Sequence, residues 1–184
     1  MPGMQQLPDG SGRWSAMQEP FRLNEKLQPY IKLHGSSDWI DLSKGEPLLV
    51  MGGNKTATID RYAILRWNHD QFKMALSKAD TRLMVIGYGF RDKHINGHIQ
   101  AVSDSGRLRL FIIDPCGVDV LQNATETYGQ HSRARTLSKC LQPHLIGASR
   151  RRLRGEIFGG DPVEHGKVMC FFGDGEMMGY PPVK

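Results

Sequence analysis

The sequence predicts an α/β fold in which helices flank a parallel sheet. Two nearly continuous apolar runs, RLMVIGY at 82–88 and LRLFIIDP at 108–115, have the composition of strands that are buried on both faces. The segment between them carries apolar residues at helical spacing. A strand, helix, strand order of this kind forms a parallel βαβ unit, and ligands of such sheets bind beyond the carboxyl ends of the strands.

Length and composition narrow the classes of protein to which the chain can belong. Its 184 residues are 39% hydrophobic and suffice for one domain with a modest core. No apolar run approaches the roughly 20 residues of a membrane span, so we expect a soluble, cytoplasmic protein with no membrane contact. The three cysteines (Cys116, Cys140 and Cys170) are far apart in the sequence. This spacing argues against a zinc ribbon and a disulfide framework, and it fits a reducing compartment.

The first third of the chain has weaker patterns. Residues 1–28 are rich in Gly, Pro and Gln and show little periodicity, so we expect loop or extended coil there. Residues 29–33, PYIKL, predict a short strand that ends just before a His-Gly turn. A second apolar run at 47–51 is followed by the loop Gly52–Lys55.

Helical periodicity recurs through the remainder. It predicts helices at 61–79 (one helix or two short ones), at 92–105 and at 131–145, and a further helix that opens with residues 118–121. Asp92 is a typical N-cap for the second of these, and Ser105-Gly106 is a typical end. The stretch from 157 onward has a mixed pattern.

His34 is the first candidate for chemistry, because it lies between a predicted strand and a glycine turn in the stretch KLHGSSDW. Proteins of the α/β class often place catalytic residues at strand ends. A histidine that titrates near neutrality could act there as a general base. The alternative is a packed histidine beside a turn, and spacing alone does not decide between the two.

A second candidate is the stretch Gly87–Asp92, GYGFRD, which leads from a buried strand into a helix. Its glycines let the backbone approach a ligand closely, and the N–H groups of a helix start favour phosphate or a ribose hydroxyl. A plain strand-to-helix turn would show the same pattern, since the third glycine of the usual dinucleotide motif is absent. Asp114, after the next strand, could bind an adenosine ribose or simply start a turn with Pro115. With His34, these residues would share one edge of the sheet.

The helix after this loop carries His94 and His98, whose four-residue spacing would let them share a metal. Neither a third ligand nor an intervening glutamate accompanies them, so we predict no metal site. Asn96 lies between the two and could point toward the candidate site. Cys116 follows a strand end, but no basic residue stands beside it to activate the thiol, which favours a structural role.

The net charge of +5 is unevenly distributed. The segment 131–154 contains basic residues and no acidic one, and it ends in the run SRRRLR. Such a segment could bind nucleic acid or the phosphates of a ligand. A solvated face with structural ion pairs is the other interpretation, which the lack of interleaved aromatic residues favours.

Three stretches, KLHGSSDW, LMVIGYGFRDKHIN and LFIIDP, occur in this order and together resemble the sirtuin-like domain family. The resemblance is closest to the bacterial branch of NAD-hydrolysing proteins that is often found in antiphage defence. It covers residues 29–172 and implies a partial Rossmann-like sheet, NAD as the substrate, and His34 as the catalytic base. The residues that it places against NAD are Gly87, Tyr88, Gly89, Phe90, Asp92, Asn96 and, near the adenosine half, Asp114.

Two departures from the family pattern qualify this resemblance. The lack of paired cysteines implies no structural zinc and argues against protein deacetylation. Residues 1–30 contain neither the Gly-Ala-Gly-x-Ser phosphate loop nor the Thr-Asn-Tyr-Asp strand that the family carries before its His-Gly stretch. We therefore expect a chain that lacks the N-terminal phosphate-loop half of the domain and is inactive as an NAD hydrolase without an upstream half-domain or a protein partner.

The expected organisation is an irregular segment at 1–28, the C-terminal portion of an NAD-binding domain at 29–172, and a flexible tail at 173–184. The alternative function is a non-catalytic interaction or nucleic-acid-binding module that uses residues 131–154. Salt dependence distinguishes the two, because binding driven by phosphate contacts weakens steeply as salt rises.

Overall fold

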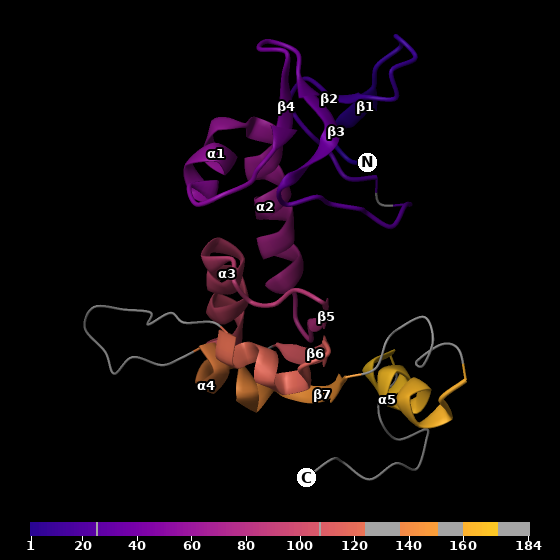
Figure 1. Cartoon of the computed structure of the whole chain (residues 1–184), viewed down its shortest axis with the longest axis vertical. Helices are drawn as coiled ribbons and strands as arrows, with labels where there is room; N and C mark the ends of the chain where they lie inside the picture. The colour runs from indigo at the N-terminus through magenta and orange to yellow at the C-terminus, as the bar shows by residue number, and fades with distance from the viewer. Residues whose placement is uncertain (25, 107, 124–136, 151–159, 173–184) are drawn as a thin grey trace, which may run out of the picture. The chain divides into compact units, whose positions relative to one another are not determined.

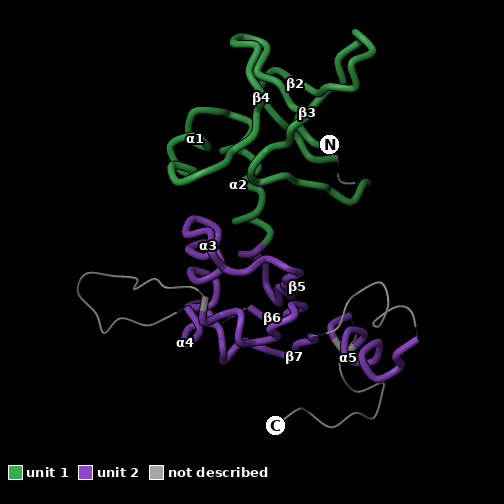
Figure 2. The backbone as a smooth tube through the Cα atoms, viewed as in Figure 1, with its two compact units in different colours: residues 1–75 green, residues 76–184 purple. Residues whose placement is uncertain are grey.

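The computed structural model describes residues 1–24, 26–106, 108–123, 137–150 and 160–172 (Figure 1). The chain divides into two compact units, Met1–Ala75 and Leu76–Lys184, here called unit 1 and unit 2 (Figure 2). The boundary falls in the last turn of a helix. Helical periodicity is continuous across this point, so the sequence did not indicate it.

Unit 1 contains a four-stranded mixed sheet and two helices. The strands lie in the order β1-β2-β3-β4, with a parallel pair between two antiparallel pairs. The elements are β1 (Met4–Gln6), β2 (Trp14–Ala16), β3 (Gly35–Asp41), β4 (Glu46–Leu49), α1 (Lys55–Arg61) and α2 (Ala63–Leu76).

The core of unit 1 joins the sheet to helices α1 and α2. Strand β3 contributes Trp39, which is 2% exposed, and the chain of β4 contributes Leu48 and Val50. Leu48 and Val50 are two residues apart and therefore face the same side, as the alternation of an extended chain requires. From the helices, Ile59, Ile64 and Leu65 complete the cluster together with Met4 of β1.

The N-terminal segment has more structure than the sequence predicted. Two three-residue strands, β1 and β2, form within residues 1–28, where we expected coil. Strand β2 pairs in parallel with β3, and Trp14 lies opposite Trp39. Three residues are too few to show alternation. The strands exist because a distant partner strand satisfies their backbone groups, which local sequence does not reveal.

The strand predicted at 29–33 is wrong. Residues 29–32 have no regular structure, Leu33 and His34 form a turn, and the strand begins only at Gly35. His34 therefore precedes a strand of the mixed sheet. The polar run Ser36-Ser37-Asp38 lies within β3, although serine and aspartate favour turns. The register with β4 shifts between Gly35 and Ile40, and the burial of Trp39 outweighs the turn preferences.

Unit 2 contains a three-stranded sheet in which β6 is the central strand and both pairs are parallel. Its elements are β5 (Arg82–Ile86), α3 (Lys93–Ser103), β6 (Arg109–Ile113), the 3-10 helix η1 (Gly117–Asn123), α4 (Leu137–Leu141), the 3-10 helix η2 (Gln142–His144), β7 (Leu145–Ser149) and α5 (Pro162–Phe172). This arrangement confirms the α/β class and the parallel sheet flanked by helices.

The sheet of unit 2 follows the sequence prediction most closely. The strands predicted at 82–88 and 108–115 are β5 and β6, and Leu110 and Ile112 of β6 are fully buried. A strand that is apolar on both faces is what a central parallel strand requires. Phe111 fits against Gly147 of β7, where a Cβ atom would lie 2.6 Å from its ring.

Two elements of unit 2 were missed. Strand β7 has the sequence LIGAS, which is short and shows no alternation. Helix α5 begins at the pattern Asp161-Pro162-Val163-Glu164, and the Asp161 carboxylate accepts the N–H of Val163 at 3.0 Å and of Glu164 at 3.1 Å. This is a regular N-cap followed by proline at the first helical position, a signal that the sequence did carry.

The helix predicted at 131–145 is present from Leu137 as α4 and η2, and the part before Leu137 lies outside the described residues. The predicted flexible tail at 173–184 also lies outside them. Within the described part of the chain, every helix is too short or too polar to cross a bilayer.

Candidate functional site

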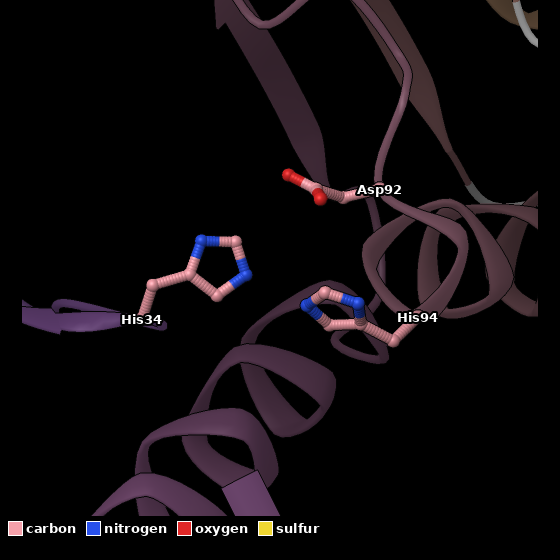
Figure 3. A group of neighbouring side chains, drawn as sticks. All are labelled: His34, Asp92 and His94. Carbon is pink, nitrogen blue, oxygen red and sulfur yellow. The ribbon is translucent and has the colours of Figure 1, made fainter. Parts of the chain in front are cut away.

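His34 stands at the end of the chain segment that enters β3 (Figure 3). Its carbonyl oxygen accepts a hydrogen bond from the Val50 N–H at 2.9 Å. The next residue, Gly35, has a φ of +72°, and a Cβ atom there would lie 1.9 Å from the Leu48 carbonyl oxygen. The turn therefore needs glycine both for its left-handed backbone and for the close approach of β4.

Helix α2 holds the same segment from within unit 1. Asn68 donates from Nδ2 to the Lys32 carbonyl oxygen at 3.1 Å, and His69 Nε2 lies 2.9 Å from the Leu33 carbonyl oxygen. Both side chains are buried. The ring centroids of His34 and His69 are 6.5 Å apart. Burial lowers the pKa of His69 below the usual histidine value, which favours its neutral form.

The side chain of Lys32 contacts three residues of β3. Its ammonium donates to the Ser36 hydroxyl at 2.5 Å and lies 3.7 Å from the Asp38 carboxylate. The same ammonium lies 5.9 Å from the centroid of the Trp39 ring. A hydrogen bond with Ser36 is the main cause that holds the pKa of Asp38 below its usual value. The Lys32 side chain thus contacts other side chains of KLHGSSDW, whereas the backbone on both sides of His34 is held by α2 and by Val50.

In unit 2, the loop Gly87–Asp92 connects β5 to α3. The Gly87 N–H donates to the Ile113 carbonyl oxygen at 2.9 Å, which ties the loop to the end of β6. Gly87 and Gly89 have φ values of +60° and +71°, and the space where their Cβ atoms would stand is open to 4 Å. A ligand can approach the backbone at both positions.

Phe90 has an unusual backbone for a residue with a side chain. Its φ is +52°, and its side chain is fully buried. A left-handed conformation of a non-glycine residue costs on the order of 1–3 kcal/mol and persists only where surrounding contacts fix it. Tyr88 contributes one such contact, because its ring packs edge-on against Phe90 with centroids 5.0 Å apart.

Asn96 of α3 supplies the other contact. Its Nδ2 donates to the Phe90 carbonyl oxygen at 2.9 Å, and its Oδ1 lies 3.0 Å from the Tyr88 hydroxyl, which donates to it. Asn96 is 2% exposed. The Asn96 amide therefore connects helix α3 to two residues of the loop. This holding role is distinct from the direct contact with NAD that the resemblance implies, which stays a prediction.

Asp92 occupies the predicted N-cap position of α3 with an extended backbone, but its side chain makes no capping hydrogen bond. His94 lies in the first turn of the helix (Figure 3). The first N–H groups of α3, an 11-residue helix, point toward its N-terminal end, where the loop enters the helix. Such groups attract anions and hydroxyl oxygens.

Asp114 follows β6 and builds a turn. Its Oδ1 accepts the Cys116 N–H at 2.8 Å, and its carbonyl oxygen accepts the Gly117 N–H at 2.8 Å. Its own N–H donates to the Ser149 carbonyl oxygen of β7 at 3.1 Å. The structure thus shows the turn that the sequence analysis considered, while contact with an adenosine ribose stays a prediction.

The loop and Asp114 lie at the carboxyl ends of adjacent parallel strands, since Ile86 of β5 pairs with Ile113 of β6. This part of the predicted convergence is confirmed. The expectation that His34 follows a strand of this sheet is wrong, because His34 precedes a strand of the other, mixed sheet. The error followed from the strand wrongly predicted at 29–33.

The basic segment is only partly described. Arg150 forms an ion pair with Asp119 at 2.8 Å, and both side chains are more than half exposed. Lys139 lies in α4. The run Arg151–Arg154 lies outside the described residues. For Arg150, the structural interpretation therefore holds.

Sequence reasoning missed Asn68 and His69. Both lie in the stretch WNHD at positions where α2 is buried. Two adjacent polar residues on the inner side of an otherwise amphipathic helix were the available signal, because buried polar groups need partners.

The family model of the SIR2-like domain matches residues 8–137. The chain belongs to the SIR2-like domain family. This match covers His34, the loop Gly87–Asp92 and Asp114, and it confirms the resemblance inferred from the three motifs. It also begins before β2, so most of the N-terminal segment belongs to the matched region. Neither the curated proteins nor the solved structures contain a match to this SIR2-like chain.

Proposed function

We propose that this SIR2-like domain binds NAD and takes part in hydrolysing the bond between nicotinamide and ribose, with His34 as the general base. The observation that carries the proposal is the presence of KLHGSSDW and GYGFRD within the matched family region. The lack of paired cysteines supports the bacterial, defence-associated hydrolase branch over zinc-containing deacetylases, and a cytoplasmic setting would supply NAD.

The chemistry sets what His34 has to do. The C–N bond to nicotinamide breaks and its electron pair leaves with nicotinamide, so the ribose becomes cation-like. Water then bonds to the same carbon and loses a proton, and the products are nicotinamide, ADP-ribose and H⁺. A neutral imidazole is suited to accept that proton near pH 7. The held backbone at Lys32–Gly35 supports this role, because a base must be oriented before the reaction.

Unit 2 supplies the binding surface in this proposal. The open backbone at Gly87 and Gly89 and the start of α3 are suited to phosphate and ribose oxygens. Tyr88, Phe90, Asp92 and Asn96 line or support that surface, and Asp114 would receive the adenosine ribose. The fixed left-handed backbone of Phe90 supports a preorganised loop.

The diphosphate needs a further element. The 184 residues contain no Gly-Ala-Gly-x-Ser loop. The stretch Gly10-Ser11-Gly12 lies in the hairpin between β1 and β2, so it is followed by a strand and offers no helix N-terminus. Several transition-state contacts are then missing, and each commonly contributes about 10² to 10³ in rate. We therefore propose that turnover requires a segment or partner that carries the phosphate loop.

The test compares the chain alone with a fusion that places the phosphate-loop segment of a relative ahead of Met1. Residues 1–28 are kept, because β2 is the parallel partner of β3. Nicotinamide and ADP-ribose are measured by chromatography, and NAD binding by calorimetry. We expect no turnover by the chain alone, turnover by the fusion, and its loss in His34→Ala.

A matched control is Met74→Ala, whose side chain on α2 is 61% exposed. It should leave turnover unchanged. Full activity of the fused His34→Ala protein would remove His34 as the base, and rapid turnover by the chain alone would refute the need for a further phosphate loop.

A further inference from the structure

Three consecutive carbonyl groups around His34 are each held by a residue from elsewhere in unit 1. The Lys32 carbonyl accepts from Asn68, the Leu33 carbonyl lies against His69, and the His34 carbonyl accepts from the N–H of Val50. Residues 32–34 lie outside the strands. The Val50 contact continues the antiparallel pairing of Gly35 with Leu49, whereas the Lys32 and Leu33 carbonyls are held by side chains. Two of the three contacts come from one turn of α2.

The chemistry of the acceptor fixes the state of His69. A carbonyl oxygen can only accept a hydrogen bond, so Nε2 of His69 carries the proton and donates at 2.9 Å. The ring is 5% exposed, and desolvation favours its neutral form. The contact with Leu33 and the burial of the ring together favour the neutral Nε2–H tautomer of His69. The same reasoning fixes the amide of Asn68, whose Nδ2 must face the Lys32 carbonyl.

These contacts do not involve the tip of any side chain of the KLHGSSDW stretch. Asn68 and His69 are 2% and 5% exposed and use their polar atoms on the backbone that precedes His34. The contacts of Asn68 and His69 with the Lys32 and Leu33 carbonyl oxygens hold the path of residues 32–34, from which the His34 side chain leaves the chain.

We infer that Asn68 and His69 are positioning residues for His34: they fix the Lys32–Leu33 backbone and thereby hold the His34 imidazole in one orientation. The functional part of this inference rests on the proposed role of His34 as the base. The positioning part stands on the contacts within unit 1 and can be measured without NAD.

The first measurement is made on the unmodified chain. A long-range ¹H–¹⁵N NMR spectrum distinguishes the two neutral histidine tautomers, and we expect His69 to carry its proton on Nε2. Three-bond couplings should report a single side-chain rotamer for His34. A proton on Nδ1 of His69 would overturn the inference directly.

The second measurement uses a matched pair of variants. His69→Gln keeps an N–H donor within reach of the Leu33 carbonyl, and His69→Leu removes it. Both lack the ring, so a difference between them reports the donor alone. We expect one His34 rotamer in His69→Gln and rotamer averaging in His69→Leu and Asn68→Leu, while Met74→Ala matches the unmodified chain. A single His34 rotamer in both leucine variants would overturn the inference.

Turnover of the fused protein separates the two levels of the proposal. A displacement of about 1 Å commonly costs about 10² in rate, so His69→Leu should lower kcat to that extent with an unchanged KM, and His69→Gln should recover most of it. Altered His34 rotamers with unchanged kcat would refute the base role and leave the positioning intact. Unaltered rotamers in a His34-dependent enzyme would refute the positioning and leave the proposed function intact.

Discussion

The two motif regions, KLHGSSDW at 32–39 and GYGFRD at 87–92, are held by different kinds of contact. The backbone around His34 depends on Val50 and on two residues of α2 that are 36 positions away. The loop depends largely on partners within eight residues, through Tyr88, Asn96 and the backbone of Phe90. The second motif is therefore held mainly by residues close to it in the sequence. The backbone of the first is held by distant residues and depends on the folding of unit 1.

A glycine substitution in the first region should cause the largest loss of stability. Gly35→Ala would add a Cβ atom 1.9 Å from the Leu48 carbonyl oxygen at a φ of +72°. We expect a loss of about 4 kcal/mol in the free energy of unfolding of unit 1. All three tryptophans (Trp14, Trp39 and Trp67) lie in unit 1, so urea denaturation followed by tryptophan fluorescence reports this unit.

Gly53→Ala is the matched control for that experiment. Gly53 lies in the loop before α1, and no atom stands within 4 Å of the position its Cβ would take. Its urea midpoint should stay close to that of the unmodified chain. Equal midpoints for the two alanine variants would contradict the close approach of β4 to Gly35.

Removal of the hydrogen bonds between Asn96 and the loop should cause the next largest loss of stability, and this loss should be confined to the loop. Asn96→Ala deletes two hydrogen bonds to the loop, at a cost of about 2 kcal/mol. Tyr88→Phe removes a hydroxyl whose single proton is shared between Asn96 Oδ1 and the Asp92 carbonyl oxygen, at a cost of about 1 kcal/mol. Hydrogen exchange of the amides at 87–92 should accelerate in that order, with the tryptophan-monitored midpoint unchanged. A large shift of that midpoint would contradict the conclusion that the loop is held by nearby residues, independently of the backbone around His34.

Acid should weaken the first region through His69. Burial lowers the pKa of His69 in the folded state, so the unfolded state binds the proton more readily. The contribution of neutral His69 to the free energy of unfolding of unit 1 should therefore be present above pH 6.5, the ordinary histidine value. It should be lost progressively as the pH drops below that value. His69→Gln should show a smaller fall between pH 7.5 and about pH 5.5, measured by urea midpoints. Equal pH slopes would show that His69 is not the residue responsible.

The smallest effect is expected at the basic segment. Arg150→Glu breaks an exposed ion pair with Asp119, which is worth at most about 1 kcal/mol. NAD affinity, measured by calorimetry, should not change, because Arg150 is engaged on the surface of unit 2. A large loss of affinity would instead assign this arginine to the NAD site.

The accuracy of the sequence predictions follows from how local each signal is. The GYGFRD loop, its N-cap at Asp92 and the buried strand β6 were all predicted, because their determinants lie in a few consecutive residues. The strand before His34 was wrong, and strand β2 was missed. In both places the backbone partners come from distant segments, so the apolar run at 29–33 misled the local interpretation and β2 had no local signal.

The sequence by itself determined the α/β class, the two motifs and the family, since burial on both faces of a strand and the chemistry of a motif are properties of adjacent residues. Only the tertiary structure revealed that His34 precedes a strand of the mixed sheet and that Asn68 and His69 hold its neighbours. Every residue has the same backbone carbonyl group, so the sequence does not show which residue will donate to it. Its partner is therefore chosen by folding, which brings α2 against residues that lie 36 positions earlier in the chain.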